Sequence, residues 1–206
     1  MTASLTTTEP IKKDREVKLP PPPQRPMRLV WTVAMYHQAI EAGILSENDE
    51  VELIAGTVIK KMAQGDRHVE CVNKLNVFFV LRYHETHIGS AQNALVLGEQ
   101  SEPEPDYVLV KKEGYTGGKP AAANCDLVIE VADSSLDLDR ADKAYLYAQA
   151  GVQEYWIVNL RGNALELHTQ PDIEAGVYNS IQRYPATASF ESPFCGSVTV
   201  ADLLPE

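Results

Sequence analysis

The sequence has few cysteines, no long apolar run and a shortage of positive charge. Its three cysteines, Cys71, Cys125 and Cys195, lie far apart and form no CxxC pair that could hold zinc or a redox disulfide. The longest aliphatic and aromatic run, residues 77–81, is far shorter than the ~20 residues that cross a bilayer. The first residues also lack the apolar segment of a secretory signal. We therefore expect a cytoplasmic protein with buried free thiols.

The shortage of positive charge restricts how the chain can bind nucleic acid. With 18 Lys and Arg residues against 29 Asp and Glu residues, the net charge is −11. Such a chain repels a polyphosphate at long range, which argues against binding through a broad basic surface. A cluster of carboxylates that binds divalent cations could instead attract nucleic acid locally, because the bound ions reverse the sign of the electric field at the site.

Proline is concentrated in one segment near the amino end. Residues 20–26 contain five prolines, a composition typical of extended polyproline or loop. We expect residues 1–26 to form an extended tail, solvated rather than bound along a partner subunit, and residues 27–206 to form one domain. The length and the globular composition of the chain agree with a single sizeable core.

Apolar periodicity and turn residues predict a mixed α/β chain. The predicted helices are residues 33–42, 67–87 and 140–150, with Asp66 and Asp139 as caps of the second and third helix. His68 begins a stripe of core-facing residues along the second helix. The predicted strands are residues 51–54 and 57–59, which form a hairpin, then 94–97, 107–110, 127–131, 155–158, 165–168 and 177–184, followed by a short carboxy-terminal stretch at 198–204.

Acidic residues within or beside apolar strands are the main anomaly. Glu130 lies inside the run 127–132, Asp106 follows Pro105 directly before a strand, and Glu52 lies between Val51 and Leu53. A buried carboxylate loses several kcal/mol of hydration unless a cation or hydrogen bonds replace it. Asp106 can reach the face of Glu130 if their two strands pair, and two such carboxylates suit Mg²⁺ or Mn²⁺.

Other side chains could complete this site, and each also has a structural interpretation. Lys143 and Tyr147 share one face of the third helix, where Lys143 could hold a phosphate or the attacking water. Alternatively, Lys143 forms a structural ion pair with Glu130 or is simply a solvated helix lysine. Glu52 could face solvent from a hairpin. His68 could be an inner histidine rather than a ligand, because imidazole is a poor ligand for magnesium.

The spacing of two motifs resembles a known superfamily. Pro105-Asp106, followed after twenty-four residues by Glu130-Val131-Ala132, resembles the PD-(D/E)XK nuclease superfamily. The segments 51–56 and 151–158, His68 and the pair Asp142-Lys143 are similar to its "putative restriction endonuclease" (Uma-type) branch. The resemblance covers residues 29–204 and leaves the tail unmatched.

The resemblance implies a restriction-endonuclease-like fold, a mixed β-sheet flanked by α-helices, with an additional amino-terminal hairpin. It implies a Mg²⁺-dependent endonuclease, with Mn²⁺ as another possible ion, that hydrolyses phosphodiester bonds in DNA by metal-activated water. Asp106 and Glu130 would be metal ligands. Lys143 would replace the superfamily's usual lysine, because Ala132 stands at that motif position.

Glu52 and His68 match positions typical of the branch and are further catalytic candidates that could orient the water or bind a second ion. A homodimer would bring two sites together for double-strand cleavage. The alternative is a non-catalytic nuclease-fold module for binding or assembly, which the acidic composition favours.

Overall fold

A computed structural model describes residues 28–205, so the predicted tail of residues 1–26 lies outside the described residues. The elements in chain order are α1 (Val33–Glu41), β1 (Val51–Ile54), β2 (Thr57–Lys60), α2 (Asp66–Tyr83), β3 (His87–Ala91), β4 (Tyr107–Lys111), β5 (Cys125–Ala132), α3 (Leu136–Leu138), a π-helical turn (Asp139–Lys143), α4 (Ala144–Gln149), β6 (Glu154–Asn159), β7 (Ala164–Asp172), β8 (Val177–Pro185), β9 (Ser189–Ser192) and β10 (Gly196–Thr199).

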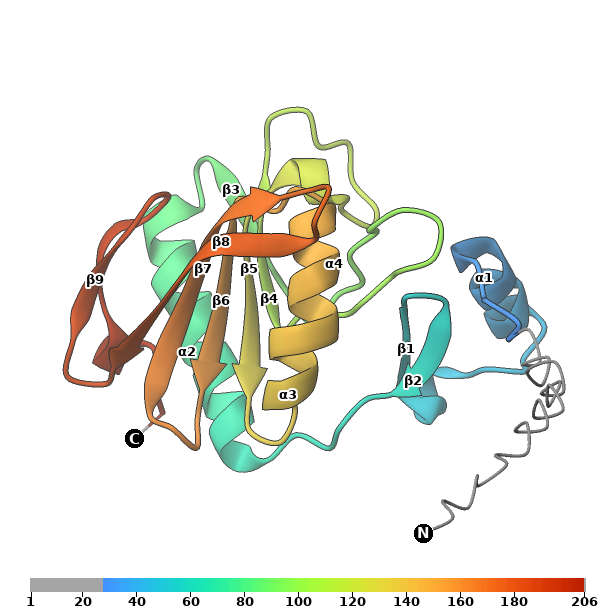
Figure 1. Ribbon diagram of the computed structural model, residues 1–206, viewed down its shortest axis with the longest axis horizontal. Coiled ribbons are helices and arrows are strands. Elements are labelled where there is room, and N and C mark those ends of the chain that lie inside the picture. Colours follow the sequence, from blue (N-terminus) through green and yellow to red (C-terminus); the bar gives the residue numbers. More distant parts are fainter. Residues whose placement is uncertain (1–27, 206) are drawn as a thin grey trace, which may run out of the picture.

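Strands β3 to β8 form one six-stranded sheet in chain order. The β5–β6 pair is parallel and every other neighbouring pair in this sheet is antiparallel. Helix α2 covers one face, and the helix formed by α3, the π turn and α4 covers the other (Figure 1). This second helix is the crossover that the parallel β5–β6 pair requires. A mixed sheet flanked by helices confirms the predicted fold class.

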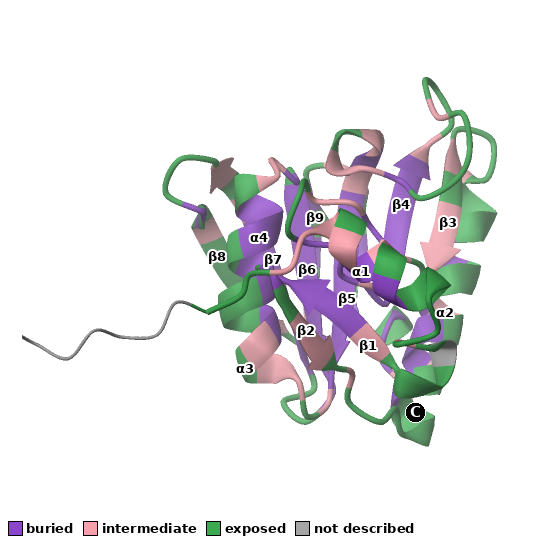
Figure 2. Cartoon of the chain, turned by 90° about the vertical axis from the view of Figure 1, so that its right-hand side faces the viewer, coloured by how far each residue is buried: buried purple, intermediate pink, exposed green. Residues whose placement is uncertain are grey.

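The sheet separates two hydrophobic cores, and β5 contributes to both. Ile129 and Val131 face the core beneath α2, whereas Val128 and Ala132 face the core beneath α4. Figure 2 shows the central strands of the sheet as the most continuously buried part of the chain. The apolar run of the sequence is therefore a central strand covered on both sides, as its composition predicts.

The predicted amino-terminal elements are confirmed. The Thr32 side chain accepts a hydrogen bond from Met35 N at 3.2 Å and caps α1. Strands β1 and β2 form the predicted hairpin, whose turn at Ala55-Gly56 has positive φ at both residues. The hairpin is attached to the rest of the protein by backbone hydrogen bonds between Leu53 and residue 102. The hairpin is therefore joined to the segment that leads to Asp106 and β4.

Two predictions between residues 83 and 97 were wrong. Helix α2 ends at Tyr83, and His87 belongs to β3, where its ring pairs with Asp126 at 2.9 Å. The strand predicted at residues 94–97 is absent, apart from an isolated bridge at Val96. The backbone N–H groups of this segment donate to loop carbonyls instead, for example from Leu95 to residue 103. Hydrogen bonds to loop carbonyls thus take the place of strand pairing and override the local strand preference.

The predicted caps of the second and third helices were also wrong. Gly65 is the N-cap of α2, and Asp66 is its first residue. The third helix begins at Leu136, before Asp139, and Asp139 lies inside it in the π turn with no exposed surface. Water therefore does not hydrate the Asp139 carboxylate, and protein groups must stabilise it instead.

The three cysteines are free, as expected, although Cys195 is only partly buried. Burial raises the pKa of Cys71 and of Cys125 to about 12, so both thiols stay protonated and unreactive at neutral pH. No helix within residues 28–205 has the combination of length and apolarity that crossing a bilayer requires.

Packing beneath α2 leads to a stability prediction. Phe79 is fully buried and contacts the rings of Tyr107 and Trp156, whereas Leu81 on the same helix is 72% exposed. We expect Phe79→Ala to lower the free energy of unfolding by about 3–5 kcal/mol, because it leaves a cavity. The control Leu81→Ala should change it by less than about 0.5 kcal/mol. Urea denaturation measures both, and equal effects would contradict the assigned burial.

Candidate active site

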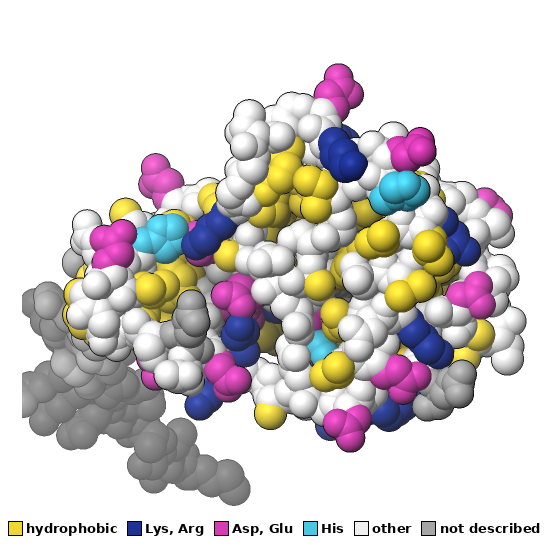
Figure 3. Space-filling view, turned by 180° about the vertical axis from the view of Figure 1, so that it is seen from behind, with side chains coloured by type: hydrophobic (Ala, Val, Ile, Leu, Met, Phe, Trp, Pro, Cys, Tyr) yellow, Lys and Arg dark blue, Asp and Glu magenta, His cyan; other side chains and the backbone are white. Residues whose placement is uncertain are grey.

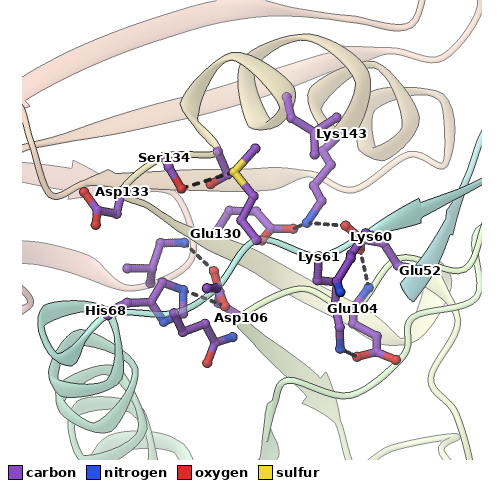
Figure 4. Close-up of a pocket in the computed structure, with 17 residues that line it drawn as sticks. Glu52, Lys60, Lys61, His68, Glu104, Asp106, Glu130, Asp133, Ser134 and Lys143 are labelled. Carbon is purple, nitrogen blue, oxygen red and sulfur yellow. Dashed lines mark hydrogen bonds and ion pairs between the residues drawn. The ribbon is translucent and has the colours of Figure 1, made fainter. Parts of the chain in front are cut away.

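The five side chains proposed from the sequence line a single cavity of about 70 Å³ (Figure 4). They come from five separate segments: β1, the start of α2, the residue before β4, the middle of β5 and the π turn. These residues are Glu52, His68, Asp106, Glu130 and Lys143, and all five are buried.

Asp106 is held on both carboxylate oxygens. Its Oδ2 accepts a hydrogen bond from Val131 N at 2.7 Å, and its Oδ1 lies 3.0 Å from His68 Nε2. Because an ionised carboxylate only accepts, Nε2 is the ring nitrogen that carries the proton toward it. Asp106 follows Pro105, which restricts the chain directly before β4. Backbone and side-chain contacts therefore fix the orientation of this carboxylate.

Glu130 lies in β5 and faces the helix that crosses over to β6. Its Oε1 accepts hydrogen bonds from Lys143 Nζ at 3.0 Å and from Tyr147 Oη at 2.7 Å. Burial raises the pKa of Glu130 well above its usual range, while the Lys143 ammonium opposes this shift. The structural ion pair considered above is therefore present, and it places Glu130 and Lys143 together at the cavity wall.

Lys143 is a buried cation surrounded by carboxylates. Besides Glu130, its Nζ lies 3.5 Å from Glu52 Oε1 and 4.0 Å from Asp139 Oδ1. Burial alone would lower the pKa of Lys143, but Glu130, Glu52 and Asp139 raise it above its usual value. The ammonium is therefore charged at neutral pH, and the interpretation of Lys143 as a solvated lysine was wrong.

Glu52 does not face solvent, so its interpretation as a solvent-facing hairpin residue was wrong. Its side chain is 5% exposed, and Oε2 accepts a hydrogen bond from Glu104 N at 3.0 Å. The same carboxylate approaches Lys143 through Oε1. Glu52 thus links the hairpin both to Lys143 and to the segment that ends at Asp106.

Asp139 was missed as a site residue because it was assigned to a helix cap. It is fully buried, and Ser135 Oγ donates to its Oδ2 at 2.6 Å. Burial raises the pKa of Asp139 to about 6, although Lys143 and the Ser135 hydrogen bond both lower it. Its position four residues before Lys143 was the available signal, because residues at i and i+4 of a helix share one face.

The outer wall of the cavity is formed by the end of β2 and the linker to α2. Lys60 of β2 and residues 61–65 of the linker line it, and Lys61 forms an ion pair with Glu104. On the opposite side, Ser134 donates to the Met62 sulfur, as Figure 4 shows. The site therefore has a floor of buried charges and a rim that contains two lysines.

The donor chemistry of this cavity fits a hard divalent cation. Asp106 and Glu130 supply carboxylate oxygens, and Mg²⁺ in proteins is commonly held by one or two carboxylates together with water and substrate phosphate. Across residues 28–205, no group of three or more His, Cys, Asp or Glu side chains is arranged to hold a metal ion. The residues therefore suit an ion that substrate and water help to coordinate, rather than a closed structural site.

The fold is similar to that of a solved protein described as a putative nuclease. The crystal structure of "a putative nuclease belonging to DUF820" from Anabaena variabilis ATCC 29413 matches this chain with a TM-score of 0.60 and 14% sequence identity. The match covers 76% of this chain and 90% of that chain. At this identity the likeness establishes the fold alone. Among curated proteins, no significant match was found.

The sequence itself matches one family over most of its length. The profile of the Uma2 family, described as "Putative restriction endonuclease", matches residues 33–198. This region contains the whole main sheet, both covering helices and all five cavity residues. The chain therefore belongs to the Uma2 family.

Proposed function

We propose that this protein is a Mg²⁺-dependent endonuclease that hydrolyses phosphodiester bonds in DNA. The observation that carries the proposal is the convergence of Asp106 and Glu130 with Lys143 in one cavity, although they are far apart in sequence. Membership of the Uma2 family supports a nuclease function. The contacts described above support separate roles for the individual side chains.

In this proposal Asp106 and Glu130 hold the divalent cation. Such an ion lowers the pKa of bound water and polarises a phosphoryl oxygen. The hydrogen bond from Val131 N and the contact with His68 keep Asp106 oriented before substrate arrives. Lys143 supplies a charged donor, which stabilises negative charge that develops on the phosphate in the transition state.

Glu52 and His68 have contacts that favour positioning roles. Glu52 accepts from Glu104 N and lies near Lys143, so it fixes the segment before Asp106 relative to the ammonium. His68 contacts Asp106 directly. We propose that Glu52 and His68 hold Asp106 and Lys143 in place. Other groups that line the cavity would then orient the attacking water.

The charge balance of the cavity also supports a cation. Three buried carboxylates, Glu52, Asp106 and Glu130, line the cavity together with the buried Lys143. A fourth buried carboxylate, Asp139, lies 4.0 Å from the Lys143 ammonium. Like charges at this density disfavour ionisation, which is why burial and neighbouring acids raise the pKa of Glu130. A bound divalent ion would remove this excess of negative charge.

The surface is consistent with a site that binds phosphate locally. On the face drawn in Figure 3, Lys and Arg side chains are interspersed with Asp and Glu, and the described residues of that face form no continuous basic patch. Lys60 and Lys61 at the rim supply positive charge beside the cavity. We propose that these lysines meet the phosphates next to the scissile one. If the protein is instead a non-catalytic binding module, the cavity needs only to bind a metal ion or phosphate and does not cleave DNA.

We also propose a homodimer, because each chain contributes one set of Asp106, Glu130 and Lys143 and two such cavities would allow both DNA strands to be cut at one place.

The nuclease proposal predicts metal-dependent cleavage. Supercoiled plasmid DNA should be nicked or linearised with Mg²⁺ and stay intact with EDTA. Asp106→Asn should reduce the cleavage rate by at least about 100-fold, because it removes a metal ligand. The matched control Asp126→Asn changes an aspartate that pairs with His87 and Lys111 outside the cavity, and its rate should stay near wild type. Undiminished cleavage in EDTA contradicts the proposal, and Mg²⁺ binding without cleavage favours the binding module.

The raised pKa of Asp139 predicts a pH dependence of stability. Burial raises the pKa of Asp139 from its usual value of 3.8 to about 6, so the folded state favours the protonated acid. This contribution is complete below the unfolded pKa and is lost as the pH rises through about 6. Between pH 4 and pH 7, the unfolding free energy of wild type should fall by about 2–3 kcal/mol relative to Asp139→Asn. Urea denaturation at both pH values measures this, and a constant difference refutes the predicted shift.

The dimer proposal predicts a concentration-independent mass of two chains in sedimentation velocity at micromolar protein. Addition of a short duplex with Ca²⁺ in place of Mg²⁺ should retain the dimer while cleavage is slowed. A monomer at every concentration, with and without duplex, would remove this proposal and leave the single-site chemistry intact.

A further inference from the structure

One carboxylate oxygen beside Lys143 has no hydrogen-bond donor among residues 28–205. Asp139 has no exposed surface, and its Oδ2 is bonded by Ser135 Oγ, whereas its Oδ1 has no such partner. This Oδ1 lies 4.0 Å from Lys143 Nζ, just beyond hydrogen-bond distance. Buried polar atoms without partners are rare in folded proteins, so this atom requires an explanation.

Asp139 is held in place, while the ammonium beside it can move. Besides the Ser135 contact, Tyr155 Oη donates to the backbone carbonyl of Asp139 at 3.1 Å. The π turn of Asp139–Lys143 places both side chains inside the protein on one helix face. Turns of this kind inside α-helices are frequent at functional sites. Lys143 reaches the cavity on a flexible four-carbon stem, so any change of contact is a movement of its Nζ.

The present contact of Lys143 conflicts with cation binding at Glu130. Lys143 Nζ and Tyr147 Oη both donate to Glu130 Oε1. A divalent cation bound to this carboxylate would repel the ammonium, which has three N–H donors and remains charged. Release of the ammonium into water is obstructed, because the Lys143 side chain is only 7% exposed. A second carboxylate oxygen within the protein would remove the conflict. Glu52 Oε1 is nearer to the ammonium, at 3.5 Å, but among the described residues Asp139 Oδ1 is the carboxylate oxygen that is buried without a donor.

We propose that Asp139 Oδ1 is a second binding position for the Lys143 ammonium, which moves there from Glu130 when a divalent cation binds. In the metal-free protein Lys143 neutralises Glu130, and in the loaded protein it neutralises Asp139 while staying at the cavity wall. Asp139 is thus a positioning residue that allows the lysine and the metal ion to be present together. This inference rests on the proposed function, because it requires a cation at Glu130.

A double-mutant cycle on metal affinity tests the proposal. Mn²⁺ binding would be measured by isothermal titration calorimetry at pH 7.5 for wild type, Asp139→Asn, Lys143→Met and the double variant. We expect Asp139→Asn to weaken Mn²⁺ binding roughly tenfold when Lys143 is present. In the Lys143→Met background the same substitution should have an effect several-fold smaller, because no ammonium then needs the second position.

A control separates this effect from the loss of one negative charge. Asp133→Asn removes a carboxylate at the rim of the same cavity, where Asp133 pairs with Arg161, and it should weaken Mn²⁺ binding much less than Asp139→Asn does. Equal penalties from Asp139→Asn with and without Lys143 would show that Asp139 acts only through its charge, and would overturn the inference. Thermal melting confirms that each variant is folded before titration.

A crystal structure with Mn²⁺ provides an independent measurement. Lys143 Nζ should lie within hydrogen-bond distance of Asp139 Oδ1 in the soaked crystal and on Glu130 in a metal-free crystal. An ammonium that stays on Glu130 beside a bound Mn²⁺ overturns the inference and leaves the proposed nuclease site standing. If wild type binds no Mn²⁺ in either experiment, both the inference and the proposed function fail.

Discussion

The buried ion pair between Glu130 and Lys143 is the interaction on which the arrangement of the cavity depends. A carboxylate in the middle of a central strand has lost its hydration, and the ammonium at 3.0 Å together with the Tyr147 hydroxyl replaces part of it. The same ammonium lies within 4.0 Å of Glu52 and Asp139, so one lysine partly neutralises three carboxylates. This excess of buried carboxylates over the one ammonium does not favour the folded state by itself. It does make the cavity suitable for binding a divalent cation.

The topology of the sheet explains why these groups meet. Strands β5 and β6 are parallel, so the chain between them must cross over, and the crossover helix lies on the face to which Glu130 points. Antiparallel pairing of β4 with β5 sets Tyr107 opposite Ile129, which places Asp106 beside the Glu130 segment. Helix α2 supplies His68 and the β1–β2 hairpin supplies Glu52 from outside the main sheet. Glu52, His68, Glu130 and Lys143 therefore lie on strands and helices, and Asp106 is fixed directly before β4 by its contacts with Val131 N and His68.

Elements that follow from residue periodicity were predicted correctly, whereas elements that depend on loop hydrogen bonds or on helix packing were not. The apolar run around Glu130 correctly predicted a strand, in which Ile129 and Val131 face one core and Ala132 faces the other. The strand expected at 94–97 did not form because its backbone N–H groups donate to loop carbonyls at residues 101, 103 and 120 instead of to a neighbouring strand. Asp139 was interpreted as a cap because a π turn leaves no recognisable pattern, and its burial depends on the packing of the crossover helix against the sheet.

The sequence by itself determined the mixed α/β class, the hairpin, the central strand with its anomalous glutamate and the identity of the acidic and basic candidates, because these follow from short-range periodicity and residue chemistry. Only the tertiary structure decided which oxygen each donor contacts: that His68 holds Asp106, that Glu52 faces inward to Lys143, and that Asp139 Oδ1 is left without a donor beside it. The first two contacts join segments tens of residues apart, and the burial of Asp139 depends on how the crossover helix packs on the sheet. Strand register and helix packing set this geometry, which no local pattern encodes.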